Sequence, residues 1–496
     1  MSSGSRRFYD ARLLPDCIRG GSLSAEVDRN GTVLVCHPPG DDSEIAQGKD
    51  LAMKRFLWCA LISLASVANG VQLSGVYQGI ALTRPGDYSY APTSMIDNGS
   101  TKCWFCTAGH SGGYDDTIYY TENFFTPQLV LCSSDNELCT DDYPTGQDQI
   151  DTCDPTVVKV NGTYYMYYTS LILGGPYGST NDLFLAMSQD GIHWTKYPAN
   201  QPPAPIMEPF FGTAYGIGGA SVVYDGSQFR MWFTFDKWWT DGNVWYATST
   251  DGIHFQVINK IYPGPTTPNW GGAVDVKYIS GWGLWFMVSN PIAGDPDAQV
   301  LWNISRDGIH WLPYNESRRI PRGAGQPHNP GIVGDSRGFV GDGTLGPQTF
   351  DVVFGDGNPF DHASSLGRST VTLTPEPLYG YFDQITADYH AVGWAYDPDT
   401  GANDAAVNGD PSAPLGFSTY VSVWVDGVPQ HNWQPSEVSR CDVRDAGLAP
   451  DCYHGFDIDL RGVVPSGTHT VQIEGGEFPT GSGGRMLNGT FTVTMP

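Results

Sequence analysis

The sequence predicts an all-β protein, with a five-bladed β-propeller followed by a β-sandwich. Three observations lead to this fold class. Of 496 residues only 16% are charged and 13% are aromatic, while Gly (61) and Pro (36) are frequent, a composition typical of chains rich in strands and turns. The motif Ser-x-Asp-Gly-Ile-His-aromatic occurs at residues 188–194, 249–255 and 305–311. Short alternating apolar segments surround each copy, and repeats built from strands are typical of propellers.

The start of the chain resembles a misplaced secretory signal. A short apolar segment, residues 56–68, follows the basic pair Lys54-Arg55 and ends in small residues, as signal peptides do. Because such signals lie at the N-terminus, we expect Met53 to be the biological start and residues 1–52 to be an upstream, non-native extension. The alternative is a genuine leader before a buried helix. On the first interpretation residues 53–70 are a signal peptide and the protein is secreted, either extracellular or periplasmic.

The charge balance excludes some partners. The net charge is −27, from 26 basic and 53 acidic residues. Such a chain has no basic patch to hold phosphates, so no nucleic-acid partner is expected. No run of 18 or more apolar residues occurs, so we expect no membrane span. We also expect a monomer.

Cysteine usage fits export. Seven cysteines follow residue 70, and disulfides are expected in a secreted chain. The short loops favour the pairs Cys132–Cys139 and Cys441–Cys452. Cys103 and Cys106 stand in a strand-like segment, where an odd spacing places two thiols on opposite faces, so we predict no metal site there. The odd total leaves one thiol free.

Residues 71–375 hold five copies of one strand pattern. Each copy has an apolar strand, a tight turn, an aromatic strand, a loop, a third strand and an Asp-Gly turn, of which the first and fifth copies are degenerate. The first strands begin near residues 91, 154, 219, 273 and 329. Asp-Gly between apolar residues predicts a two-residue hairpin of type I′. Residues 76–82 form a further strand, which we expect to close the ring against the last blade.

One stretch of this pattern resembles a known family. Residues 154–194 contain Asp-Pro-Thr-Val-Val, Gly-Thr-Tyr-Tyr-Met-Tyr-Tyr-Thr and Ala-Met-Ser-x-Asp-Gly-Ile-His-Trp. This arrangement resembles the five-bladed propeller glycoside hydrolases, the arabinanase and β-xylosidase group that includes family 43, over residues 75–375. The resemblance implies a carbohydrate substrate and hydrolysis by two carboxyl groups. It implies no required cofactor, but a possible structural calcium ion (Ca2+) that His328 would help to hold.

The chain departs from the family pattern at important positions. That pattern places a carboxylate at the start of each of the first three inner strands. This chain has Tyr90-Ala91 at the first, Asp154 at the second and Ile217-Gly218 at the third. The family mechanism therefore cannot be transferred whole. A non-catalytic, glycan-binding propeller is the alternative to a hydrolase.

The candidate site lies at one end of the propeller. The starts of the first strands and the loops between second and third strands share that end, whereas the Asn-Gly and Asp-Gly turns share the other. Variable loops are where binding usually occurs. We predict three catalytic carboxylates: Asp154 as base or electrostatic partner, Glu208 as the acid whose pKa burial would have to raise, and Asp275 in reserve. Each can instead be structural, as a strand cap, an exposed loop residue and a satisfied buried carboxylate. The predicted substrate-binding residues are Tyr90, Trp238, Trp239, Trp270, His328 and Asn329. In a chain with 15 Trp, most must lie in the core.

Residues 379–496 are predicted to form a separate module. Pro375-Glu-Pro377 interrupts the repeat and is typical of a linker. Short alternating strands then predict a β-sandwich. Gly-Trp-Ala-Tyr-Asp-Pro at 393–398 and His-Gly-Phe at 454–456 resemble the Ig-like modules of bacterial secreted enzymes. We expect a spacing or accessory binding role.

Overall fold

The computed structural model describes most of the chain after residue 70. The described residues are 26–27, 33–34, 71–83, 88–108, 116–134, 146–175, 178–210, 215–235, 244–261, 273–290, 300–309, 311, 318–358, 363–397, 419–449, 452–476 and 484–496. The chain divides into two units, Met1–Ala65 and Ser66–Pro496. In the first unit β1 (Glu26–Val27) pairs with β2 (Val33–Leu34). The predicted signal peptide lies outside the described residues. Of the described helices, none is long and apolar enough to span a membrane.

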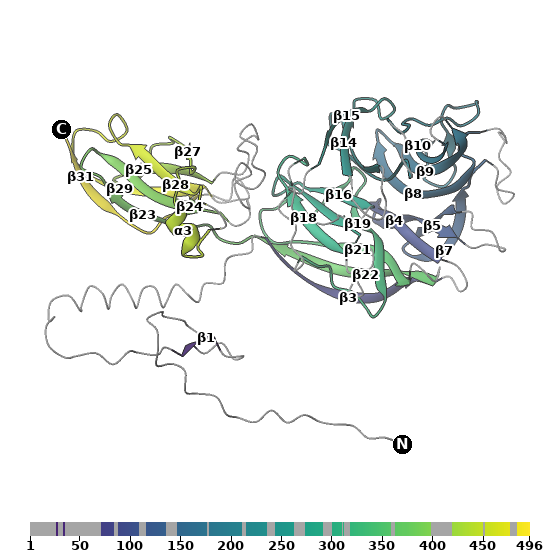
Figure 1. Cartoon of the computed structure of the whole chain (residues 1–496), viewed down its shortest axis with the longest axis horizontal. Coiled ribbons are helices and arrows are strands. Elements are labelled where there is room, and N and C mark those ends of the chain that lie inside the picture. Colours follow the sequence, from purple (N-terminus) through teal and green to yellow (C-terminus); the bar gives the residue numbers. More distant parts are fainter. Residues whose placement is uncertain are drawn as a thin grey trace, which may run out of the picture. The chain divides into compact units, whose positions relative to one another are not determined.

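Five sets of strands form a propeller in the first part of the second unit (Figure 1). The first set is β4 (Tyr88–Asp97), β5 (Ser100–Ala108), β6 (Thr117–Glu122) and β7 (Phe125–Leu131). The second is β8 (Ile150–Val160), β9 (Thr163–Gly175), β10 (Gly178–Ser188) and β11 (Thr195–Lys196). The third is β12 (Ile217–Tyr224), β13 (Phe229–Phe235), β14 (Val244–Ser249) and β15 (Gln256–Lys260). The fourth is β16 (Val274–Ile279), β17 (Leu284–Ser289) and β18 (Leu301–Ser305), with β20 (Phe339–Val340) parallel to β16.

The fifth set closes the ring with a strand from the other end of the region. It contains β19 (Gln326–Asp335), β21 (Gln348–Asn358) and β22 (Ala363–Thr374). Its outer strand is β3 (Gln72–Leu82), which runs antiparallel to β22 (Figure 1). β19 also pairs with β4 in parallel, so the fifth set joins the first. The predicted closing strand is confirmed.

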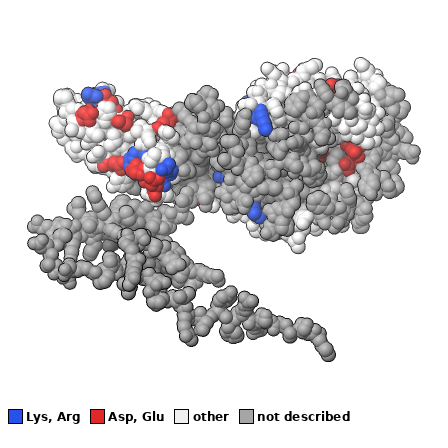
Figure 2. Space-filling model, in the orientation of Figure 1, with Lys and Arg blue, Asp and Glu red and all other residues white. Residues whose placement is uncertain are grey.

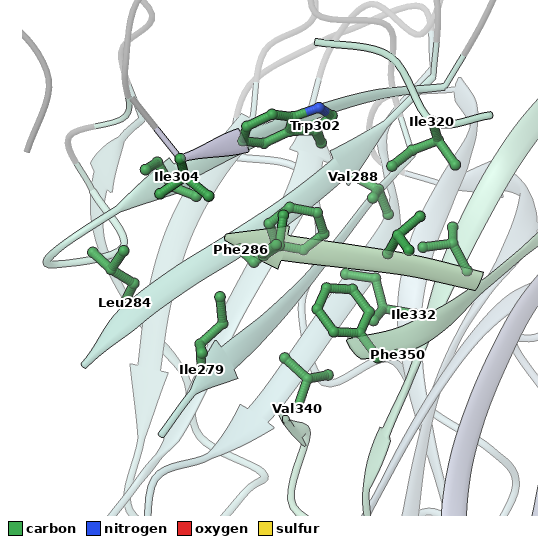
Figure 3. Packing of buried hydrophobic residues seen from close by; sticks show 14 of the residues in the cluster. Ile279, Leu284, Phe286, Val288, Trp302, Ile304, Ile320, Ile332, Val340 and Phe350 are labelled. Atoms are coloured by element: carbon green, nitrogen blue, oxygen red, sulfur yellow. The ribbon is translucent and has the colours of Figure 1, made fainter. Parts of the chain in front are cut away.

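Among the described residues, the propeller core is divided into five clusters, each between two neighbouring sets. In the cluster between the fourth and fifth sets, Phe286 and Trp302 face Phe350 and Ile332 (Figure 3). The other four clusters join the first set to the second, the second to the third, the third to the fourth and the fifth to the first. Each sheet therefore packs on both faces, which explains why these strands are almost continuously apolar or aromatic.

The Asp-Gly motif forms a different turn from the one predicted. β10 and β11 resume pairing at Met187 and Thr195, so the connection is longer than a two-residue hairpin, and Gly191 but not Asp190 has a positive φ. The type I′ prediction is wrong here because Ser188 Oγ accepts the Gly191 N–H, and Asp190 Oδ1 accepts the N–H groups of Ile192 and His193. These side-chain bonds stabilise a wider loop. Two-residue turns with two positive φ angles occur instead at Asn98-Gly99, Asn161-Gly162 and Asp426-Gly427.

The C-terminal strands form two sheets around one core. The first contains β23 (Tyr379–Ile385), β24 (His390–Tyr396) and β28 (Gly455–Asp459). The second contains β25 (Tyr420–Val425), β26 (Val428–Pro429), β27 (Gln434–Pro435), β29 (Gly467–Gly476), β30 (Gly484–Met486) and β31 (Phe491–Met495). Apolar residues of both sheets, such as Phe382 and Val423, share one cluster, which makes a β-sandwich. Among the described strands, no pairing joins this sandwich to the propeller. The described helix is α3 (Cys441–Asp445).

Charged side chains on the described surface are mixed in sign. Figure 2 shows acidic and basic residues interspersed, with no broad basic patch among the described residues on the face that it draws. Arg440, for example, pairs with Asp383 and Asp442.

The disulfides agree with the sequence in part. Cys441 and Cys452 are bonded, as predicted. Cys132 is also disulfide-bonded, but Cys139 lies outside the described residues, so that pairing stays a prediction. A Cys106–Cys153 disulfide, 47 residues apart in sequence, was not predicted. Cys103 is the free, buried thiol among the described cysteines.

Candidate active site

The first strands of the five sets have the same unusual backbone near their starts. Ala91, Asp154, Gly219, Ala273 and Asn329 have φ values of 46°, 48°, 55°, 59° and 44°. This left-handed region is unfavourable for most residues with a Cβ atom, and strain of this kind is common at functional sites. A bulge interrupts the strand pairing at four of the five positions. All five residues line one cavity of about 30 Å³. The strand starts therefore converge at one end of the propeller, as predicted.

Just beyond this ring, side chains tie the first strand of each of the first four sets to that of the next set. Thr93 accepts the N–H of Val157, Thr156 that of Val222, Ser221 that of Val276, and Asp275 that of Ile332. Asp275 thus takes the same place as two threonines and a serine. It also accepts the Ser221 hydroxyl (2.7 Å) and pairs with Lys277 (2.5 Å). These contacts favour a structural role for Asp275 over that of a general acid.

Asp154 is the one carboxylate among these five ring residues, and Asp275 also lines the cavity. The side chain of Asp154 is buried, and burial raises its pKa to about 6, against a smaller lowering by the Gly219 N–H and the Asn329 side chain. The Asn329 amide lies near the carboxylate, although its Nδ2 makes no hydrogen bond of ordinary geometry. Asp154 can therefore hold a proton under mildly acidic conditions, where an ordinary aspartate cannot.

A second carboxylate, Asp116, stands close to Asp154. Asp116 Oδ2 accepts a hydrogen bond of 2.7 Å from the Tyr90 hydroxyl. An Asp116 oxygen lies within 4.8 Å of Cys153 Sγ, and Cys153 Sγ lies 3.6 Å from Asp154 Oδ1. The two carboxylates are thus no farther apart than about 8.5 Å, below the upper limit of about 9.5 Å for the paired carboxyls of glycoside hydrolases.

Aromatic side chains surround the two carboxylates. Tyr88 and Tyr90 stack with ring centroids 4.4 Å apart. Burial, and then the charges of Asp116 and Asp154, raise the pKa values of Tyr88, Tyr90 and Tyr215. These phenols therefore keep their protons and can serve as hydrogen-bond donors beside the carboxylates.

His328 is placed in this site, but not as a metal ligand. Its Nδ1 faces the Gln326 carbonyl at 3.1 Å, so Nδ1 carries the proton, and Nε2 accepts from the Tyr88 hydroxyl at 2.8 Å. Burial lowers the pKa of His328 to about 4, which keeps the ring neutral. Both nitrogens are engaged, and calcium prefers oxygen ligands, so these residues do not fit the calcium ion that the family resemblance implied. Cys106 and Cys153 lie near Asp116, but their disulfide leaves no thiolate to bind a metal.

Glu208 lies next to another buried carboxylate, Asp182. Glu208 itself is exposed, so it lacks the burial that a general acid needs. The neighbouring Asp182 is buried, and burial followed by the charge of Glu208 raises its pKa to about 7. Asp182 sits on β10, opposite Ser170 of β9, whereas Cys153, next to Asp154, pairs with Thr169. Asp182 is therefore at the same end of the second set, two strands away from Asp154.

The structure brings together some of the predicted residues. Asp154, Tyr90, His328 and Asn329 meet at the strand starts, whereas Trp238, Trp239 and Trp270 lie outside the described residues. We did not predict from the sequence that Asp116 lies near Asp154. We also did not predict the disulfide beside them. The signal for Asp116 was its place before the third strand of its set, at the predicted end of the propeller, but several other acidic residues share that property.

No protein-family profile and no curated protein sequence matches the chain. Among solved structures, the catalytic domain of the Coprinopsis cinerea GH62 α-L-arabinofuranosidase is similar, at 10% identity and a TM-score of 0.41, over 61% of this chain and 98% of that one. Zg3597, a family 117 glycoside hydrolase of Zobellia galactanivorans, is similar at 12% identity and a TM-score of 0.41, over 61% and 91%. A thermostable family-43 glycoside hydrolase shows 13% identity and a TM-score of 0.38, over 61% and 94%. None of these similarities identifies a reaction or a substrate for this chain.

Proposed function

We propose that the protein is a secreted glycoside hydrolase that cleaves a glycosidic bond in an oligosaccharide or polysaccharide. The observation that carries this proposal is the carboxylate pair Asp116 and Asp154. One member is buried with a pKa of about 6, and the other is partly buried and held by a tyrosine hydroxyl. Glycosidic hydrolysis requires this division between a carboxyl that donates a proton and a carboxylate that does not.

The pKa of Asp154 assigns the roles. As the group that stays protonated under mildly acidic conditions, Asp154 donates the proton to the leaving oxygen. This differs from the role of base or electrostatic partner predicted from the sequence. Asp116 then acts as base or nucleophile, and the hydrogen bond from Tyr90 fixes the direction of its carboxylate. Glu208 and Asp275 have no direct part in this assignment.

The sugar would bind outside the axial cavity. A volume of about 30 Å³ holds about one water molecule and no sugar ring. The sugar therefore has to lie above Asp154, on the outer side of the ring of strand starts. Tyr90 is partly exposed and offers aromatic surface there, while the hydroxyls of Tyr88 and Tyr90 contact His328 and Asp116.

A second function, glycan binding without cleavage, is favoured by one observation. Ala91 and Gly219 stand at the two ring positions equivalent to Asp154 where the family pattern has carboxylates. If Asp116 does not replace them, the site binds sugars but lacks one half of the acid–base pair.

The proposal also includes secretion of the protein and its division into a propeller and an accessory domain. Disulfides at Cys106–Cys153 and Cys441–Cys452 favour an oxidising compartment. The strand sets support a propeller at 71–375 and an accessory sandwich at 379–496. The sandwich would act as a spacer for the propeller or bind carbohydrate.

The test uses 4-nitrophenyl glycosides, beginning with α-L-arabinofuranoside and β-D-xyloside. We expect Asp154→Asn and Asp116→Asn each to lower kcat/KM by at least about 100-fold, because each removes one side of the acid–base pair. Asp335→Asn, a change at an exposed ion pair with Arg337, is the matched control and should stay within about twofold of wild type.

The pH dependence tests the assignment of the acid. Wild-type kcat/KM should fall as the pH rises through about 6, because Asp154 loses its proton there. Asp154→Asn should lack that limb of the profile. Undiminished activity in both Asn variants would refute the site. Sugar binding by an inactive wild-type protein would instead support the second function.

A further inference from the structure

The Cys106–Cys153 disulfide lies between the two proposed catalytic carboxylates. Cys153 directly precedes Asp154, and its Sγ is 3.6 Å from Asp154 Oδ1 and 3.1 Å from the Tyr90 hydroxyl oxygen. Both sulfurs lie within 4.8 Å of an Asp116 oxygen. Cys106 is fully buried and Cys153 is 5% exposed. The bond thus fills the space between the acid, the base and the tyrosine that orients the base.

The disulfide also holds a segment in which strand pairing is interrupted on both sides of Cys153. The register between β8 and β9 shifts between Ile150 and Cys153, and again between Cys153 and Thr156. Asp151 and Asp154, on either side of Cys153, both have left-handed φ values. A bulge of this kind has fewer ladder hydrogen bonds to define its position. The link to Cys106, which pairs with Tyr90 of β4 and Ile118 of β6, adds a constraint on this bulge.

The same two strand sets are joined by other contacts that do not involve the disulfide. Lys159 pairs with Asp97 at 2.9 Å, the Trp104 indole N–H donates to the Gly191 carbonyl at 2.8 Å, and a buried apolar cluster lies between the sets. The association of the first two sets therefore does not depend on this one bond. Its particular effect is on the local position of the bulge that carries Asp154.

We propose that the Cys106–Cys153 disulfide is a positioning element of the active site, which sets the placement of Asp154 relative to Asp116. This inference rests on the proposed hydrolase function. Cys106 and Cys153 take no part in bond cleavage. They act through the acid that follows Cys153 and through the tyrosine that contacts its sulfur.

The experiment removes one disulfide at a time from the full chain. The test variant is Cys106→Ala/Cys153→Ala, and the matched control is Cys441→Ala/Cys452→Ala, which removes the disulfide of the C-terminal sandwich. We expect the test variant to lose about 10- to 100-fold in kcat with KM within about threefold, the effect of a small misplacement of a reacting group. The control should keep wild-type kcat. Both should lower the melting temperature.

A second readout separates positioning from general loss of structure. The alkaline limb of the pH profile, which Asp154 sets, should move in the test variant and stay in place in the control, because only the first disulfide contacts Asp154. If the alanine pair does not fold, Cys106→Val/Cys153→Ala, which restores more of the buried volume, replaces it. An active wild-type enzyme whose test variant keeps both kcat and pH limb overturns the inference, as does an equal loss of kcat in the control.

Failure of the proposed function gives a different result from failure of this inference. A wild-type protein without activity on any glycoside contradicts that function. The disulfide is then tested by stability alone: the change in unfolding free energy caused by Asp154→Asn, measured against pH, should differ between chains with and without the first disulfide. An unchanged pH dependence overturns the inference in that case.

Discussion

At the scale of residues, the site combines a strained backbone with a buried charge. Asp154 has a φ of 48° and a buried carboxyl whose pKa is raised to about 6. An aspartate that serves only the fold is more stable with an unstrained backbone and a carboxylate exposed to water. Functional sites keep such costs because relieving them removes the group that reacts. Asp275, equally buried, avoids the cost through its ion pair with Lys277 and the hydrogen bonds that it accepts from Ser221 and Ile332.

Asp154→Asn should therefore raise stability while it abolishes activity. The folded pKa of about 6 exceeds the unfolded value of about 3.9, so ionising Asp154 destabilises the folded state by roughly 3 kcal/mol at most. This cost is absent below about pH 4 and is complete above about pH 7. Asn keeps the shape and tolerates the left-handed backbone. Denaturant unfolding at pH 4 and pH 8 should show a gain at pH 8 only, and an equal effect at both would contradict the assigned pKa.

At the scale of elements, the repeated motif connects neighbouring strand sets. An aromatic donor on the second strand of one set reaches the Gly carbonyl of the motif in the next set. The pairs are Trp104 with Gly191, Tyr167 with Gly252 and Trp232 with Gly308, at 2.8, 2.8 and 2.7 Å. Two of the motif histidines, His193 and His254, stay at the turn, where they pair with the aspartates of their own loops. The motif therefore has a structural role at the end opposite the site.

Trp232→Phe should measure the strength of one such connection. The change removes a buried hydrogen bond and part of a fully buried ring, and we expect a loss of about 2–4 kcal/mol in the free energy of unfolding. Trp245→Phe is the matched control, because the Trp245 Nε1 has no hydrogen-bond partner among the described residues. Equal losses in both variants, followed by denaturant unfolding, would show that the hydrogen bond contributes nothing.

At the scale of the whole propeller, closure depends on a strand from the start of the region. β3 covers the outer edge of β22, and Val71, Leu73 and Tyr77 pack on the cluster between the fourth and fifth sets. An uncovered β22 would present a long row of unpaired backbone groups, which favours aggregation. The 11 residues of β3 thus protect an edge as well as fill a core.

Deletion of residues 71–82 should destabilise the propeller strongly. Loss of three packed side chains alone removes at most about 4.5–9 kcal/mol of burial, at about 1.5–3 kcal/mol each, and the free edge should produce higher oligomers. Size-exclusion chromatography and thermal unfolding measure both effects. Val76→Thr, at a position 64% exposed on the same strand, is the control and should behave as wild type. A monomeric deletion variant with an unchanged melting temperature would show that the ring closes without β3.

The sequence by itself determined the propeller, the sandwich, the closing strand and the end of the propeller where Asp154 lies. These follow from local chemistry: alternating apolar residues, turn residues and a repeat whose copies bury one another. Even the Cys441–Cys452 bond joins residues 11 apart. Only the tertiary structure decided which carboxylate accompanies Asp154, that Asp275 is neutralised by Lys277, and that Cys106 bonds to Cys153. The reason is physical. Pairings between separate strand sets, and the burial that shifts a pKa, depend on how the sets close around the axis, and no local pattern in the chain encodes that closure residue by residue.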